Sequence, residues 1–351
     1  MPLATEQLRV LIVRLGAMGD ILHALPAVTA LRQAHPQWFL GWAVEPRWQP
    51  LFRDSQGTMP LVDCIHLASA RQWARAPFSP TTIAEIRALR REIRAQRYDV
   101  SIDMQGAVRS ALLARMASTP RIVGEDCPRE HAARWLFRER IPAQGAHVIE
   151  QAMEVANAIA GENLQPVPPL LPSDPESEAW AQKLLQSEPG GGNRHLVLLS
   201  PGAGWGAKRW PPERYGEVAA QLQAAGWRVL VNAGPGEKQI AAAVVAASQG
   251  AAETPEFTLP RLIAVTRHAR LFVAGDTGPL HLACALGVPV VGIYGPTDPR
   301  RNGPFGVPFR VLRHPESKRD HTRSAEPEAG LLTITPAQVF AAAMELLGDG
   351  A

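Results

Sequence analysis

One stretch of the chain decides its fold: Phe272-Val-Ala-Gly-Asp-Thr-Gly-Pro-Leu-His-Leu-Ala-Cys-Ala-Leu-Gly-Val-Pro-Val-Val-Gly-Ile-Tyr-Gly-Pro-Thr-Asp298. An apolar run ends at Gly275, a short polar turn and a small-residue segment follow, and a second apolar run comes next. The pattern predicts strand, turn, helix and strand, which is one repeat of an open parallel α/β sheet. A helix that begins after Asp276 presents free N–H groups and the positive end of its dipole, so this turn is suited to hold an anion such as a diphosphate.

The same layout recurs near the start of the chain. Residues 8–13 are apolar apart from Arg9, Arg14-Leu-Gly-Ala-Met-Gly-Asp20 is expected to form a turn, and a helix is expected after it. Between the two regions, residues 165–175 contain five prolines in eleven positions, which can continue neither a helix nor a central strand. We therefore predict an α/β protein with two doubly wound parallel-sheet domains that face each other across a cleft.

Strands and helices alternate in both halves of the sequence. In residues 1–165 we expect strands at 8–13, 38–44, 62–67, 98–103 and 120–124, and helices at 20–34, 80–96, 106–117 and 147–160. In the second half we expect strands at 195–200, 227–232, 270–274 and 288–294, and helices at 212–225, 236–249, 258–268, 278–286 and 336–347. In such sheets ligands bind beyond the carboxyl ends of the strands, where both glycine-rich turns are expected.

Composition excludes several classes of protein. The chain has 351 residues, 46% of them hydrophobic, and no apolar run approaches the roughly 20 residues needed to span a bilayer. No secretory signal is visible at its start, and its three cysteines are isolated, so we expect neither a disulfide framework nor a zinc site. A cytoplasmic protein is the simplest interpretation. The first half is rich in arginine, whose guanidinium group binds carboxylates and phosphates in a bidentate manner.

The N-terminal turn matches a dinucleotide-binding motif only in part. That motif requires G-x-G-x-x-G, and here Arg14, Gly16 and Gly19 occupy the three glycine positions. Glu45 ends the second predicted strand, where it can imitate the acid that binds a ribose. An NAD(P)-dependent oxidoreductase is therefore a disfavoured alternative.

Asp20 lies in the first turn of the predicted helix, directly after Gly19. An aspartate there can cap the helix by accepting its free N–H groups. It can also act as a general base that takes a proton from a hydroxyl group. The residues alone leave both interpretations open.

A second glycine-rich segment, Gly202-Ala-Gly-Trp-Gly-Ala-Lys-Arg-Trp-Pro-Pro212, follows the predicted strand that ends at Ser200. Its glycines, Gly204 among them, allow backbone to approach a ligand closely, and Lys208 offers a point charge. The alternative is a surface loop with a solvated lysine. The chain contains no D-x-D pair and no H-E-x-x-H, so we expect the charge of a diphosphate to be neutralised by Lys208 and helix N-termini, without a metal.

Taken together, five segments resemble glycosyltransferase family 9, the ADP-heptose:lipopolysaccharide heptosyltransferases. The segments are Leu11-Ile-Val-Arg-Leu-Gly-Ala-Met-Gly-Asp-Ile-Leu-His-Ala-Leu-Pro26, Asp103-Met-Gln-Gly106, Lys208-Arg-Trp-Pro211, Gly275-Asp-Thr-Gly-Pro-Leu-His281 and Tyr294-Gly-Pro-Thr-Asp-Pro299. They occur in the family's order over roughly residues 8–300.

The resemblance implies a GT-B architecture. We expect an acceptor-binding Rossmann-like domain at 1–165, a nucleotide-sugar-binding Rossmann-like domain at 166–335, and a C-terminal helix within 336–351 that packs back on the N-terminal domain. The implied activity is inverting, metal-independent transfer of heptose from ADP-L-glycero-D-manno-heptose to the lipopolysaccharide inner core, with no cofactor. A GT-B transferase that uses another nucleotide sugar, or a non-catalytic nucleotide-sugar-binding protein, are the alternatives.

The resemblance also assigns roles to residues. Asp20 matches the family's proposed catalytic base. The residues that match or fall near donor-binding positions are Gly204, Lys208, Glu237, Asp276, Thr277, Gly278 and His281. The loops that bind anionic acceptors contain Arg71, Arg75 and Arg129. For His281, contact with a phosphate and packing within its own helix remain equal alternatives, and Tyr294-Gly-Pro-Thr-Asp298 is either part of the donor site or a structural turn.

The partners implied are an ADP-heptose donor and a lipid-linked core saccharide acceptor, and no nucleic acid. The acceptor class suggests peripheral contact with the cytoplasmic face of the inner membrane. Arginines at 87, 90, 91 and 94 of the predicted helix 80–96, with Arg97 directly after it, can supply a basic face for such contact, or an ordinary solvated surface.

Overall fold

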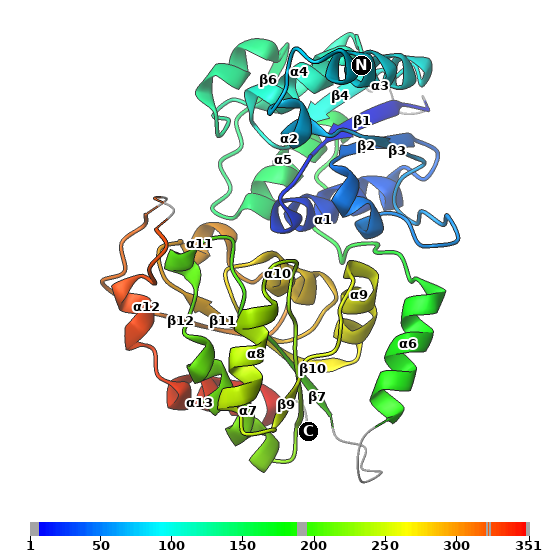
Figure 1. The fold of residues 1–351 in the computed structure, drawn as a ribbon. Helices are drawn as coiled ribbons and strands as arrows, with labels where there is room; N and C mark the ends of the chain where they lie inside the picture. Colours follow the sequence, from blue (N-terminus) through cyan, green and yellow to red (C-terminus); the bar gives the residue numbers. More distant parts are fainter. Residues whose placement is uncertain (1–6, 188–194, 321, 323, 349–351) are drawn as a thin grey trace. The chain divides into compact units, whose positions relative to one another are not determined.

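The computed structural model describes residues 7–187, 195–320, 322 and 324–348. The chain forms two compact units, Met1–Pro172 and Ser173–Ala351 (Figure 1). Each unit is built around one six-stranded sheet in which all paired strands are parallel. This confirms the predicted fold class of two doubly wound α/β domains.

The sheet of the first unit has the strand order β3-β2-β1-β4-β5-β6. Its strands are β1 (Arg9–Val13), β2 (Phe39–Val44), β3 (Cys64–Leu67), β4 (Val100–Asp103), β5 (Arg121–Glu125) and β6 (Glu139–Ile141). Its helices are α1 (Met18–Ala34), α2 (Ala70–Trp73), α3 (Pro80–Ala95), α4 (Val108–Met116) and α5 (Val148–Ala160), with 3-10 helices η1 (Pro46–Leu51) and η2 (His131–Leu136). The central strands are nearly continuous apolar runs because helices cover both faces of a parallel sheet.

The second unit repeats this topology, with the strand order β12-β11-β10-β7-β8-β9. Its strands are β7 (Leu196–Ser200), β8 (Arg228–Val231), β9 (Ala252–Glu253), β10 (Ala269–Gly275), β11 (Val290–Tyr294) and β12 (Phe309–Arg313). Its helices are α6 (Pro175–Gln186), α7 (Pro212–Ala224), α8 (Lys238–Ala247), α9 (Leu259–Arg267), α10 (Gly278–Ala285), α11 (Pro299–Asn302), α12 (Ala329–Thr333) and α13 (Pro336–Gly348), with the 3-10 helix η3 (Gly206–Lys208).

Alternate residues along the strands of the second sheet pack into two separate hydrophobic cores, one on each face of the sheet. Val197, Leu199 and their neighbours pack against α7, α8 and α13, whereas Leu196 and Leu198 pack against α6, α9 and α10. This is the period-two alternation of a strand that is buried on both faces. The order of chain connections reverses between β1 and β4 in the first sheet and between β7 and β10 in the second. These two switch points are where open α/β sheets bind ligands.

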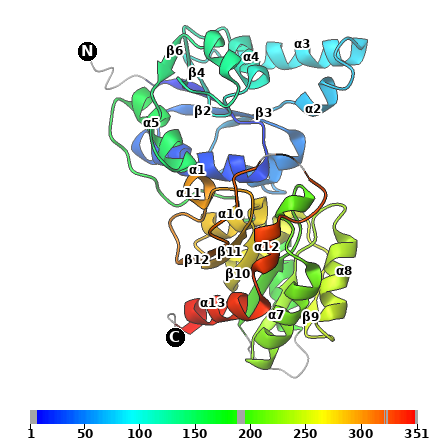
Figure 2. The same ribbon diagram turned by 90° about the vertical axis from the view of Figure 1, so that its left-hand side faces the viewer.

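The C-terminal helix differs from the expectation. The buried face of α13, which includes Val339, Ala343 and Leu346, belongs to the core of the second unit. Figure 2 shows α13 beside α7, and the two helices are in contact. The apolar stripe of α13 thus covers the second sheet, whereas the sequence predicted that this helix packs back on the N-terminal domain. The units also divide after Pro172 and not after residue 165.

Seven strands and α-helices were not predicted from the sequence: β6, β9, β12, α2, α6, α11 and α12. Helices α2, α11 and α12 are only four or five residues long. The three strands are short or partly exposed strands at or near the sheet edges, so they lack the apolar run that marks a central strand. Helix α6 begins inside the proline-rich segment, where Asp174 caps it and Pro175 takes its first position. Among the described residues, no helix is both long and apolar enough to cross a membrane.

Candidate active site

The first unit gathers several polar side chains at its switch point. Arg14 directly follows β1, Asp103 is the last residue of β4, and Val13 pairs with Asp103 in the sheet. The Arg14 guanidinium donates to the backbone oxygen of Met104, just beyond β4, and through Nε to the backbone oxygen of Asp20 at 3.1 Å. Arg14 therefore joins the ends of both central strands to the start of α1.

The carboxylate of Asp20 is held through both oxygens yet remains accessible. Its Oδ1 lies 3.2 Å from Nη2 of Arg14, and its Oδ2 accepts a hydrogen bond of 3.0 Å from the backbone N–H of Ala17. Ala17, with no capping side chain, is the N-cap of α1, and Asp20 is three residues further on. Asp20 thus helps to cap the helix, as one interpretation predicted. Its side chain is still 40% exposed, so the carboxylate is also available to accept a proton.

Asp103 fixes the turn that follows β4. Its Oδ1 accepts from the backbone N–H groups of Gln105 (2.7 Å) and Gly106 (3.0 Å), and its Oδ2 accepts from the Ser110 hydroxyl (2.9 Å). Burial raises the pKa of Asp103 to about 6, although these hydrogen bonds and the charge of Arg14 act in the opposite direction. The carboxyl group is fully buried and serves the geometry of the turn.

A buried carboxylate at the end of β2 collects two arginines. Glu45 lies 3.2 Å from Nη2 of Arg47 and 3.4 Å from Nε of Arg71, while its own side chain is only 7% exposed. Burial and the neighbouring charge of Arg71 lower the pKa of Arg47. Glu45, which the sequence offered as a ribose-binding acid, therefore positions the guanidinium groups of Arg47 and Arg71.

The other two predicted acceptor-binding arginines are exposed. Arg75 lies just after α2, and Arg129 pairs with Glu130 at 3.5 Å. The backbone of Arg129 passes close to Gly106, because a Cβ atom at position 106 would lie 2.9 Å from the Arg129 nitrogen. Gly106 also has a φ of +65°, which favours glycine. The fold thus brings the Arg129 loop against the turn that Asp103 fixes.

In the second unit, Asp276 is the centre of a buried polar cluster just beyond β10. Lys208 Nζ pairs with its Oδ2, His281 Nε2 lies 3.2 Å from its Oδ1, and Asn302 donates to Oδ2 at 3.4 Å. Burial acts to raise the pKa of Asp276, but the hydrogen bond with His281 and the charge of Lys208 outweigh it and hold the pKa well below its usual range. The His281 ring thus contacts Asp276, which lies just before α10.

The start of α10 provides hydrogen-bond donors next to this cluster. Thr277 is the N-cap residue, makes no capping hydrogen bond with its side chain, and is followed by Gly278 and Pro279 in the first turn. The hydroxyl groups of Thr277 and Thr297 are buried and have no partner among the described residues. Unpaired donors at a helix start beside a lysine are suited to bind an anion.

The glycine-rich loop after β7 also lies at this edge. A Cβ atom at Gly206 would lie 1.6 Å from the Ala325 backbone oxygen, and one at Gly202 would meet the Glu237 carboxyl group at 2.1 Å. Glu237 also accepts from the Gly234 N–H at 2.8 Å, so it lies beside the ends of β7 and β8. Gly204 is exposed with open space around it, so close protein packing does not require glycine there.

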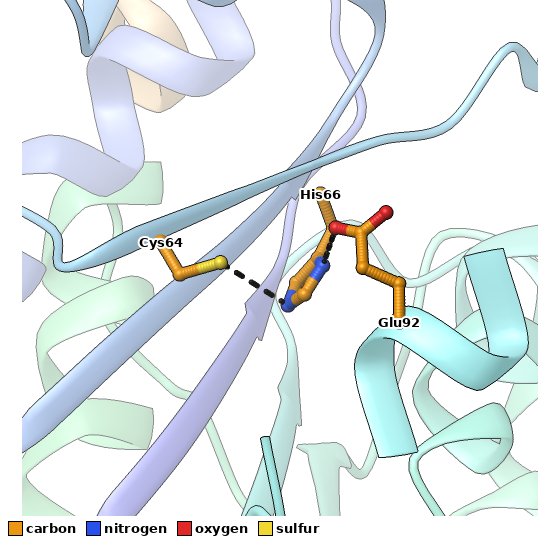
Figure 3. A group of neighbouring side chains, drawn as sticks. All are labelled: Cys64, His66 and Glu92. Atoms are coloured by element: carbon orange, nitrogen blue, oxygen red, sulfur yellow. Dashed lines mark hydrogen bonds and ion pairs between the residues drawn. The ribbon is translucent and has the colours of Figure 1, made fainter. Parts of the chain in front are cut away.

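A cluster of potential metal ligands lies away from these residues. Among the described residues, Cys64, His66 and Glu92 are the one group of at least three such side chains close enough to share an ion. Figure 3 shows the His66 ring between the other two, with Glu92 at Nδ1 and the Cys64 sulfur 3.9 Å from Nε2. The Tyr98 hydroxyl also bonds Nε2 at 2.7 Å, so both ring nitrogens have partners. Burial raises the pKa of Cys64, which disfavours the thiolate that metals bind. The cluster therefore serves as a hydrogen-bond network around the buried His66 ring, between β3 and α3.

Comparison with known proteins identifies the family. The sequence model of Glycosyltransferase family 9 (heptosyltransferase) matches residues 86–331. Lipopolysaccharide heptosyltransferase 1 of Pseudomonas aeruginosa is 31% identical over 304 residues, which are 85% of this chain and 82% of that protein. The chain belongs to glycosyltransferase family 9. A second family 9 relative, lipopolysaccharide heptosyltransferase 1 of Escherichia coli K12, is 31% identical over 88% of this chain and 94% of its own length.

Solved structures of the family have the same fold. E. coli heptosyltransferase WaaC with ADP is similar with a TM-score of 0.77 and 28% identity, over 98% of this chain and all of that one. WaaC with ADP-2-deoxy-2-fluoro heptose is similar with a TM-score of 0.74 over the same extent. Sequence reasoning about this family 9 chain missed Asn302 and Arg47, because nothing in their local sequence distinguishes them from surface residues.

Proposed function

We propose that this protein is a heptosyltransferase that transfers heptose from ADP-L-glycero-D-manno-heptose to the lipopolysaccharide inner core, with inversion at the anomeric carbon and without a metal ion. The observation that carries the proposal is the pair of polar clusters at the two switch points. One contains an accessible carboxylate, Asp20, and the other contains a lysine at a helix start, Lys208. These are the two kinds of group that an inverting transfer needs.

The proposed mechanism assigns one step to each cluster. Asp20 accepts the proton of an acceptor hydroxyl as its oxygen attacks the anomeric carbon. The bond from that carbon to the diphosphate breaks, and the departing ADP carries the negative charge. Lys208 and the N–H and hydroxyl groups at the start of α10 stabilise this charge, which is the kind of preorganised electrostatic contribution that is often largest in catalysis.

Donor binding is proposed for Gly204, Lys208, Glu237, Asp276, Thr277, Gly278 and His281. Of these, Lys208 is proposed to pair with a phosphate. Asp276, which contacts both Lys208 and His281, is proposed to hold the lysine in place. Acceptor binding is proposed for Arg71, Arg75 and Arg129, since exposed guanidinium groups recognise carboxylates and phosphates.

The proposal is tested by incubating the protein with ADP-heptose and a core acceptor. The expected result is release of ADP together with a heptosylated acceptor, detected by mass spectrometry. The anomeric configuration of the product, read by NMR, should be the opposite of the donor's, and turnover should persist in excess chelator. A panel of other nucleotide sugars provides the comparison: faster transfer from one of them would replace heptose as the proposed substrate.

We also propose peripheral contact with the inner membrane through the exposed face of α3. Arg87, Arg90 and Arg91 are exposed on this helix, and Phe78, just before it, is 89% exposed. Each basic residue near an anionic surface contributes about 1 kcal/mol of attraction. Arg90→Glu/Arg91→Glu should lower binding to phosphatidylglycerol vesicles by at least about tenfold, whereas Arg270→Glu/Lys318→Glu on the second unit should have little effect. Equal loss in the two variants would contradict the assignment of this face.

A further inference from the structure

Gln105 lies in the turn beyond β4 and is almost completely buried, with 4% of its surface exposed. Its backbone N–H and that of Gly106 both bond to the Asp103 carboxyl group. Because Asp103 is itself fully buried and bonded to Ser110, the turn that carries Gln105 is fixed before any ligand arrives.

The orientation of the Gln105 amide is determined by its partner. Its Oε1 accepts a hydrogen bond of 2.9 Å from the backbone N–H of Leu15. The reverse orientation would place an NH₂ group against another N–H donor, so the oxygen must point toward Leu15. The Nε2 atom therefore points elsewhere, and it has no hydrogen-bond partner among the described residues.

An unpaired buried amide is unfavourable, because its N–H groups lose water without gaining another partner. Unpaired groups of this kind need an explanation, and a bound ligand that supplies the missing oxygen is one. No charged or polar side chain of the surrounding cluster takes the place of that oxygen. The nearby carboxylates are paired with other groups: Asp20 with Arg14 and the Ala17 N–H, and Glu45 with Arg47 and Arg71.

The position of Gln105 ties it to the proposed base. Leu15, which holds the Gln105 oxygen, follows Arg14, and Arg14 pairs with Asp20. Arg14 also bonds the backbone of Met104, the residue before Gln105. The unpaired amide group and the Asp20 carboxylate are thus attached to the same short turn between β1 and α1.

We propose that Nε2 of Gln105 donates a hydrogen bond to an oxygen of the acceptor saccharide, either a hydroxyl or a carboxylate oxygen, and so orients the acceptor at Asp20. The inference rests on the proposed heptosyl transfer and adds an acceptor-binding residue to it. The amide takes no part in breaking or forming covalent bonds.

The test uses Gln105→Glu, which keeps an oxygen for the Leu15 N–H but lacks the two donors when ionised. We expect the acceptor KM, and the acceptor Kd measured by calorimetry without donor, to rise about tenfold or more. The Kd for ADP should stay within about twofold of wild type, because the change lies in the first unit. Lowering the pH should partly restore acceptor binding, since a protonated carboxyl group regains one donor.

Gln105→Met removes both the donors and the acceptor without adding charge. It tests the role of Gln105 if Gln105→Glu does not fold. Its acceptor Kd should rise at least as much, with ADP binding retained. If the wild type transfers heptose but a folded variant binds the acceptor as tightly as the wild type, Gln105 does not have the proposed role. The proposed function would still stand. A wild-type protein that neither binds nor heptosylates the core acceptor would overturn the proposed function, and the role of Gln105 with it.

Discussion

Asp103 is a carboxyl group kept inside the first unit, and its environment has a measurable consequence. Burial raises its pKa from an ordinary 3.8 to about 6 in the folded chain. The folded protein therefore binds more protons than the unfolded chain between about pH 4 and pH 6, and its free energy of unfolding falls as the pH rises through this range. At about 1.4 kcal/mol per unit of pKa, the loss amounts to roughly 3 kcal/mol.

The Asp103→Asn variant should lack this contribution. An amide can still accept from the Gln105 and Gly106 N–H groups through its oxygen, so the turn is expected to form. Relative to the variant, wild type should gain stability as the pH is lowered from 7 to 4, measured as the difference in melting temperature of the first unit. A difference that does not change with pH would show that Asp103 has an ordinary pKa.

Asp276 differs from Asp103 in that its pKa is lowered despite burial, because it is paired with His281 and Lys208. Lys208→Met leaves a buried carboxylate without its cation, which costs about 3–5 kcal/mol when a buried pair is broken. The double variant Lys208→Met/Asp276→Asn removes the uncompensated charge and should recover part of that stability in denaturant titrations. ADP binding should remain weak in both variants, because the lysine is missing. A double variant no more stable than Lys208→Met would argue against a charge effect.

Residues differ in how well the sequence alone revealed them. Lys208 and Asp276 follow strands in glycine-containing turns, and the structure brings them together as a pair. Glu45 also follows a strand, but its partner Arg71 comes from α2, a separate segment of the chain. Their meeting depends on tertiary structure, and no local pattern could predict it. The roles proposed for Asp20 and the acceptor-binding arginines stay predictions.

At the scale of elements, the central strands and long helices were predictable because both are strongly apolar in their own period. The edge strands β6, β9 and β12 were not, since partial exposure removes that signal. Helix α13 was predicted as an element with the N-terminal domain as its partner, whereas its buried face belongs to the core of the second unit. An apolar stripe shows that a helix is covered but does not show by what.

Helices α7 and α8 pack so closely that one position must be glycine. A Cβ atom at Gly216 would lie 2.4 Å from the Ala247 Cβ and 2.8 Å from the Val244 backbone oxygen. Helix propensity alone predicts that Gly216→Ala stabilises the protein by about 1 kcal/mol. Forcing the helices apart costs about 1–3 kcal/mol, so the net effect should be a lower melting temperature.

The companion change Ala247→Gly tests the cause of that loss. In the Gly216→Ala background it removes the nearest clashing atom and should raise the melting temperature, although it lowers helix propensity. If Gly216→Ala is itself more stable than wild type, the close packing of α7 and α8 is wrong.

At the scale of the whole molecule, each unit has its own core and its own switch-point cluster. A fragment of residues 173–351 retains α13 and should bind ADP with a Kd within about threefold of the full chain, without transferring heptose. A fragment of residues 173–335 loses the helix that covers the second sheet and should aggregate or melt without cooperativity. Equal behaviour of the two fragments would contradict the place of α13 in this core.

The central claim is that Asp20 is the base that activates the acceptor. The most direct measurement is single-turnover heptose transfer by Asp20→Asn, an uncharged isostere whose oxygen can still accept from Ala17. We predict a rate lower by about 10²–10⁴-fold, the range for a lost general base, with unchanged Kd values for ADP and acceptor. Transfer at a rate near that of wild type, with both substrates bound normally, would contradict the claim.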